Sequence, residues 1–182
     1  MHAIRTFSVL LALALAAGCS DANSLANPTH SNVVDTVTLG ALEGTSIQTP
    51  SAYSVAIGAV RTDQTIEFEF AYNVEASGRR VLLPRKVLGL TTKSGVEPGL
   101  QASASTFDEI IVAPSNGYVT DSAVPAELGQ RWLVRSRVIC TIGVPQYAKI
   151  EILSFEDSTV TFKVLADNNC GYKGLEPGFP DR

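Results

Sequence analysis

Histidine and methionine are scarce in this chain of 182 residues, which contains two histidines and one methionine. After position 2 the only histidine is His30, which lies in a polar stretch rich in Ser, Asn and Ala. Serine and cysteine nucleophiles commonly depend on a histidine base held beside them. Because no histidine follows His30, the sequence argues against a Ser–His or Cys–His enzyme.

Basic charge is also low, since 14 Lys and Arg stand against 18 Asp and Glu, a formal net charge of −4. A nucleic-acid partner is therefore not expected, because no basic stripe is present to neutralise phosphates. The one basic cluster comprises Arg79, Arg80, Arg85 and Lys86. We interpret these residues as charged flanks that guard an edge strand, with anion binding as the alternative.

Paired catalytic carboxylates and metal-ligand clusters are not apparent either. Glu67 and Glu69 alternate with apolar residues, which predicts that both lie on one solvated strand face rather than on opposite sides of a substrate. Asp157 and Asp167 have no partners at calcium-loop spacing, and no glycine-rich phosphate motif precedes a helix. The sequence therefore predicts neither an enzyme nor a metal site.

The first 19 residues carry the clearest signal of the chain. A positive start at Arg5, an apolar run over 7–17 and the small residues 16–18 form a secretory signal that ends at Cys19. The segment resembles the lipobox of bacterial lipoproteins, although Ala16 holds the place of the usual Leu. The resemblance implies cleavage before Cys19 and lipidation of its thiol. An ordinary secretory signal with a chance cysteine is the alternative.

This interpretation divides the chain into a signal peptide (1–18), a flexible tether (19–32) and one domain (33–182). The apolar run is about half the length that a bilayer-spanning helix needs. Ser20 follows the cysteine, which resembles an outer-membrane sorting signal. We therefore expect an envelope protein held on the membrane, and most simply on the outer membrane, by its lipid.

Two cysteines remain in the domain, Cys140 and Cys170. In an exported chain they most simply form one disulfide. A pair of free thiols is the second interpretation. Metal ligation is the third, because two thiols without a histidine make a poor zinc site.

The pattern of the domain is almost entirely β. The residues 132–141, 147–155 and 159–166 predict three strands of an antiparallel meander, which brings Cys140 and Cys170 to the same end of the sheet. Alternating apolar residues over 65–72 predict a further strand with one buried face. Shorter strands are predicted at 33–39, 53–60, 80–83, 86–92 and 109–112, a loop at 93–101, and the only helix candidate at 102–110.

Several segments between residues 88 and 165 are similar to the HmuY-like lipoprotein family. They include Phe107-Asp108-Glu109, the stretch from Ala113 to Tyr118, Trp132 to Ser136, and Tyr147 to Ile152. The resemblance implies an all-β domain, either a single antiparallel sheet or sandwich-like, on a surface lipoprotein. The best-known members of the family capture haem.

The residues that bind haem iron in that family are missing here. Haem iron in the known members is held by His or Met, and neither residue occurs after His30. Tyr118 and Tyr147 are the remaining candidates for a haem or porphyrin ligand, although core packing is the common role of a strand tyrosine. The sequence therefore predicts a binding module for a small hydrophobic or tetrapyrrole ligand with weak haem affinity. The alternative is a structural or protein-interaction lipoprotein without a small-molecule ligand.

Overall fold

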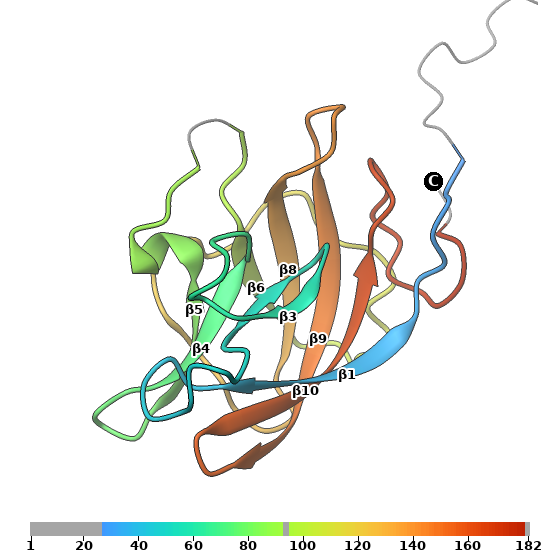
Figure 1. The fold of residues 1–182 in the computed structure, drawn as a ribbon. Coiled ribbons are helices and arrows are strands. Elements are labelled where there is room, and N and C mark those ends of the chain that lie inside the picture. Colours follow the sequence, from blue (N-terminus) through green and yellow to red (C-terminus); the bar gives the residue numbers. More distant parts are fainter. Residues whose placement is uncertain (1–26, 93–94, 181–182) are drawn as a thin grey trace, which may run out of the picture.

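The structure is a computed structural model that describes residues 27–92 and 95–180. The predicted signal peptide and the predicted lipidation site, Cys19, lie outside the described residues. The described chain forms two antiparallel five-stranded sheets (Figure 1). This arrangement confirms the predicted all-β fold, in its sandwich-like form.

The longer strands form one sheet, here called the meander sheet. In spatial order it contains β1 (Val34–Gly40), β10 (Thr159–Asp167), β9 (Pro145–Glu156), β8 (Arg131–Val138) and β6 (Gly99–Ser103). Each neighbouring pair is antiparallel. The predicted meander of the last three strands is therefore confirmed, and β1 adds to it along β10.

The second sheet is built from shorter strands and is called the short-strand sheet. Its spatial order is β3 (Gly58–Val60), β2 (Ala52–Ser54), β4 (Phe70–Val74), β5 (Arg80–Pro84) and β7 (Val124–Pro125). The predicted strand at 53–60 is thus a hairpin of two short strands. It lies in front of the meander sheet in Figure 1.

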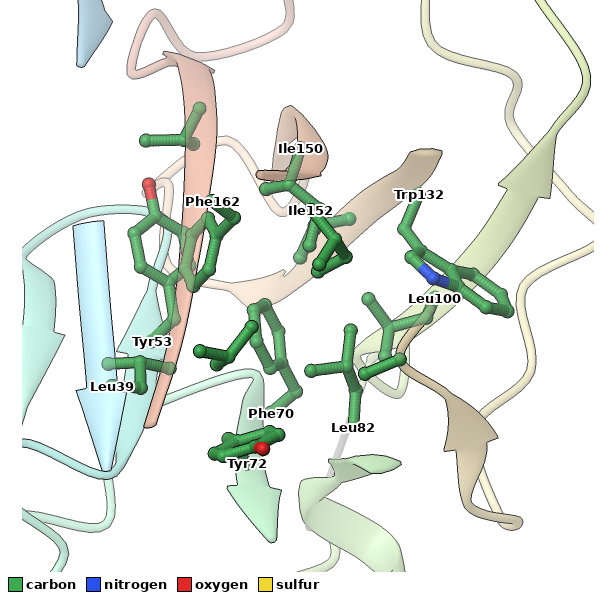
Figure 2. Packing of buried hydrophobic residues seen from close by; sticks show 14 of the residues in the cluster. Leu39, Tyr53, Phe70, Tyr72, Leu82, Leu100, Trp132, Ile150, Ile152 and Phe162 are labelled. Carbon is green, nitrogen blue, oxygen red and sulfur yellow. The ribbon is translucent and has the colours of Figure 1, made fainter. Parts of the chain in front are cut away.

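The main core fills the space between the two sheets. Strand side chains alternate between two faces, and each sheet turns an apolar face toward the other. Tyr53 and Phe70 of the short-strand sheet meet Phe162 of β10, with ring centroids 5.6 and 6.1 Å apart. The buried residues labelled in Figure 2 are Leu39, Tyr53, Phe70, Tyr72, Leu82, Leu100, Trp132, Ile150, Ile152 and Phe162.

A second core covers the outer face of the meander sheet. Leu133, Tyr147 and Leu165 of that face pack against Phe107 and Leu175, which come from the loop after β6 and from the C-terminal segment. Both faces of β9 are consequently buried over its first six residues. Period-two alternation predicts only one buried face, so the sequence pattern does not predict this second core.

Lys149 of β9 lies beneath this loop and is buried. Its Nζ donates to the carbonyl oxygens of Phe107 (2.7 Å) and Ile110 (2.9 Å) and lies over the Phe107 ring. These contacts satisfy the ammonium group without a carboxylate in hydrogen-bond range. The amine therefore fastens the loop to the sheet.

The prediction of a strand over 65–72 is wrong for its first half. β4 begins only at Phe70, and Ile66 is exposed. The chain turns at Arg61, whose carbonyl accepts from the amides of Gln64 and Thr65. Phe68 and Phe70 are buried as predicted, but they lie in different local structures.

Other local predictions are also corrected. The predicted strand at 86–92 does not form, because the 3₁₀ helix η1 (Arg85–Leu88) occupies its first residues and ends where Gly89 adopts a φ of 78°. The predicted loop at 93–101 already contains the start of β6. No helix forms at 102–110, and the predicted strand at 109–112 is a turn that makes a single bridge, Val112 to Gly174.

The disulfide between Cys140 and Cys170 is confirmed, with Cα atoms 5.7 Å apart. Between residues 168 and 180 the chain forms no strand longer than a bridge. The predicted tether (19–32) reaches into the packed chain. Asn32 is buried and exchanges two backbone hydrogen bonds with Gly178, so the packed chain begins before residue 33.

Candidate functional site

Tyr118 and Tyr147, the two predicted ligand residues, lie together over the outer face of the meander sheet. Their ring centroids are 6.3 Å apart, and the Arg135 guanidinium lies 4.5 Å from the centre of the Tyr118 ring. Tyr147 is buried in the second core, against which the partly buried Tyr118 packs. The Tyr118 hydroxyl donates to the Pro114 carbonyl at 2.9 Å.

The surroundings of both tyrosines make their hydroxyl groups weaker acids. Burial raises the pKa of Tyr118 above its ordinary value, and the neighbouring Tyr147 raises it further. Burial also raises the pKa of Tyr147. Deprotonation to tyrosinate is therefore harder at both positions, and neither residue lines either of the two surface grooves described below.

His30 does not complete such a site. Its side chain is exposed, and Nδ1 lies 3.0 Å from the Thr29 hydroxyl. Within residues 27–92 and 95–180, no three His, Cys, Asp or Glu side chains gather where they could share a metal ion. In the same part of the chain, no helix has the length and apolar character to cross a bilayer.

The most suggestive hollow lies between β1 and the β2–β3 hairpin, where the two sheets meet at one side of the sandwich. We call it the edge groove, and its volume is about 330 Å³. Val37 and Val164 of the meander sheet face Tyr53 and Val55 of the hairpin across it. The remaining lining residues are Ser31, Val33, Val34, Asp35, Ala56, Ile57, Gly58, Ala166 and Asn168.

β1 forms one margin of this groove and is also an end strand of its sheet. Successive backbone groups of a strand point alternately to its two sides. The Ala41 amide donates to Ser158, toward the β10 side, whereas the Gly40 amide donates to Pro50 and the Thr36 amide to the Asp35 carboxylate. The amides of Val34 and Thr38 therefore point away from β10, toward the open side.

The hairpin on the other margin is held by Glu69. This carboxylate is 1% exposed, and its Oε2 accepts from the Val55 amide at 2.7 Å. Its Oε1 accepts from Arg137 of β8 at 3.1 Å, and Arg137 also pairs with the exposed Glu67. The prediction of a shared solvated face for both glutamates is therefore wrong, because Glu69 turns inward to join the two sheets.

The environment of Glu69 changes its acidity. Burial raises the pKa of the Glu69 carboxyl to about 7. The Val55 amide and the Arg137 guanidinium oppose this rise, but they do not cancel it. The hairpin margin therefore carries a carboxyl group that gains and loses its proton near neutral pH.

The start of β1 is held by Asn169, which follows β10. Its Oδ1 accepts from the Thr29 and His30 amides at 2.8 and 2.9 Å, and its Nδ2 donates to the His30 carbonyl. Asp167 orients Asn169 through its side chain, and the disulfide at Cys170 follows directly. The chain thus enters the domain at a fixed point beside the edge groove.

The predicted basic cluster is divided among separate contacts. Arg79 pairs with Glu75, and Arg80 lies over the Phe155 ring. Arg85 is buried, and its Nε donates to the Leu90 carbonyl. The guard interpretation fails for Arg85, whose guanidinium holds the chain after η1 instead.

The edge groove could not have been found from local sequence patterns. Its walls come from β1, the β2–β3 hairpin and the end of β10, which are far apart along the chain. Apolar residues at its rim, such as Ile57, are visible in the sequence, but only the structure shows that Ile57 is 62% exposed. Comparisons with protein-family models, with curated proteins and with solved structures gave no match.

Proposed function

We propose that this protein is an envelope lipoprotein, anchored through Cys19, whose domain is a non-catalytic binding module for a small apolar ligand. The observation that carries the ligand proposal is the edge groove, a hollow between the two sheets where aliphatic side chains and the Tyr53 ring stand beside polar groups. The disulfide between Cys140 and Cys170 supports the location, since disulfides persist in oxidising compartments outside the cytosol.

The lining of the edge groove suggests the chemistry of its ligand. Aliphatic side chains and the Tyr53 ring form the walls, while Asp35 and Asn168 supply polar groups. Ligand sites are commonly apolar with few polar groups and measure about 300–1,000 Å³. The groove lies near the lower end of this range. Asp35 favours a neutral or cationic ligand over an anionic one.

The groove can be tested with Nile red, a neutral apolar dye whose fluorescence rises in apolar surroundings. We expect saturable binding to the purified domain, and we expect Ile57→Asp to weaken it about tenfold or more, because a charge would line the groove. Ile66→Asp is the matched control, since Ile66 is similarly exposed and does not line the groove. Equal dye affinity in both variants would reject the groove as the site.

The anchor is tested separately in cells that express the full chain. Mass spectrometry of the mature protein should show an acylated N-terminal Cys19, and Cys19→Ser should release the domain from membranes or block its processing. Firm attachment implies more than one acyl chain, because a single chain holds only marginally. A soluble wild-type protein without acyl mass and with another N-terminus would overturn the anchor.

A protein partner is the second candidate function, and the open edge of β1 favours it. The outward amides of Val34 and Thr38 and the adjacent edge groove resemble the requirements for addition of an extended strand. A photo-crosslinking residue at position 36 should then form an adduct in cells, and Thr38→Pro should abolish it. Pro at 38 removes the outward amide and the hydroxyl contact with Thr161, while the backbone ladder between β1 and β10 loses no hydrogen bond.

A further inference from the structure

Three exposed apolar side chains lie beside the point where the chain enters the domain. Ile111, Val112 and Phe179 are exposed and line one shallow groove together with prolines 177 and 180. Phe179 is 64% exposed and is the only aromatic residue among the exposed large hydrophobic side chains of the described chain. We call Ile111, Val112 and Phe179 the root face.

The root face is built on a firm base. The Leu175 amide donates to the Ile111 carbonyl, and Leu175 itself is fully buried. The Asn32 side chain donates to the carbonyls of Gly174 and Glu176. The backbone that carries these exposed apolar side chains is therefore held in place by hydrogen bonds and by a buried leucine.

The entering chain runs directly beside this face. Asn32 and Gly178 form an antiparallel bridge with two backbone hydrogen bonds, of 2.7 and 3.0 Å. Asn32 is buried at the bridge, whereas Val33 and Phe179, one residue beyond each partner, are exposed.

The length of chain before this point limits the distance to the anchor. Thr29, whose amide is already bonded to Asn169, lies ten Cα–Cα steps after Cys19. Fully extended, they span at most about 35 Å, and a flexible chain of this length averages about 17–19 Å. A lipid on Cys19 would consequently hold the root face at a high effective concentration near the bilayer.

We propose that the root face rests in the interfacial layer of the membrane that holds the anchor, an inference that rests on the proposed lipidation at Cys19. Aromatic and aliphatic side chains favour this layer, and lysine is common at its polar side. Lys173 lines the same groove, and its Nζ donates to the Ser115 hydroxyl, a partner that a lipid phosphate would replace in the proposed contact, while Glu176 remains in water at its margin. The contact would orient the domain on the membrane.

The test couples the purified domain, beginning at Cys19, through that thiol to maleimide lipids in phosphatidylcholine vesicles. Anchoring is then imposed chemically and does not depend on native acylation. Phe179→Trp reports contact through quenching by brominated lipid, and Leu128→Trp is the matched control. Leu128 is 70% exposed and precedes Gly129, which is bonded to Ile152 of β9, away from the Asn169 end.

We expect the brominated vesicles to quench most of the fluorescence added at position 179 and little of that added at position 128. A second substitution, Val112→Ser, should reduce the quenching at position 179 while the vesicles still carry the protein. Equal quenching at both positions, or none at either, would overturn the proposal.

A second copy of the chain is the competing occupant of the root face. It would give a blue-shifted but unquenched tryptophan at position 179 and a dimer of the uncoupled domain in sedimentation, and this result also overturns the proposal. Loss of native acylation would instead reject the anchor while the coupled vesicles still report on the root face. The experiments therefore distinguish failure of the proposed anchor from failure of the proposed membrane contact.

Discussion

The meander sheet and the short-strand sheet enclose the same core, but different interactions hold them. Strands of the meander sheet contain 5 to 12 residues, so their backbone ladders are long. Strands of the other sheet contain only 2 to 5 residues. The backbone ladders of the short-strand sheet are therefore short, and buried side-chain contacts hold the segments between its strands.

Glu69 and Arg85 are the clearest of these contacts. Glu69 joins the end of β2 to β8, and Arg85 fastens the chain after η1. In the meander sheet the buried charge of Lys149 holds a covering loop, while the ladder itself continues through β9. The short-strand sheet should therefore depend more strongly on single polar side chains.

The largest expected effect follows from Glu69→Ala. The substitution leaves the Val55 amide without this partner and leaves Arg137 paired only with the exposed Glu67, and loss of one member of a buried pair costs about 3–5 kcal/mol. We expect the free energy of unfolding to fall by this amount in denaturant titrations. Hydrogen exchange should show the loss of protection first in β2 and β3, and equal loss in β9 would contradict the comparison.

Reduction of the Cys140–Cys170 disulfide should act on the meander sheet instead. The bridge spans 30 residues, and closure of a loop of this size contributes roughly 2–4 kcal/mol. Thermal unfolding with and without reductant measures the change. Peptide mass mapping under non-reducing conditions should show the two cysteines linked, and two free thiols in oxidised protein would reject the bridge.

The pH dependence of stability should report mainly on the short-strand sheet. The pKa of Glu69 rises from 4.5 to about 7 on folding, so the folded state binds this proton more tightly than the unfolded state. Its contribution is full below pH 4.5 and is lost as the pH rises through 7, by about 3 kcal/mol in total.

Denaturant midpoints between pH 5 and pH 8 test this sign. Burial also raises the pKa of Asp167, which adds a change in the same direction. Glu69→Gln should retain the Val55 hydrogen bond and remove the larger part of the slope. A slope in Glu69→Gln as steep as in the wild type would show that Glu69 does not titrate in this range.

The smallest effect is expected at the outer face of the meander sheet. Replacement of Tyr118 and Tyr147 by Phe retains both rings and removes one hydrogen bond, to Pro114, at a cost of about 0.5–1.5 kcal/mol. A haem or metal-free porphyrin titration should show weak binding, or none, before and after the change. Tight haem binding that this double substitution abolishes would establish a tyrosinate site and refute our ligand assignment.

The two sheets also differed in how far they could be predicted. Three strands of the meander sheet follow from long runs of β-forming residues, and their antiparallel order places Cys140 beside Cys170. The strand over 65–72 failed because its alternation is equally compatible with a bend that buries Phe68, Glu69 and Phe70 together. Short strands carry few residues of pattern, so tertiary contacts outweigh local preference there.

The sequence by itself determined the β class of the domain, the meander of its last three strands and the pairing of Cys140 with Cys170, because these depend on alternation and chain order. Only the tertiary structure decided the second core, the inward turn of Glu69, the edge groove and the root face. Each of these joins segments far apart along the chain. Burial and hydrogen bonding between such segments have no local pattern, because they arise only when the two sheets and the C-terminal segment pack together.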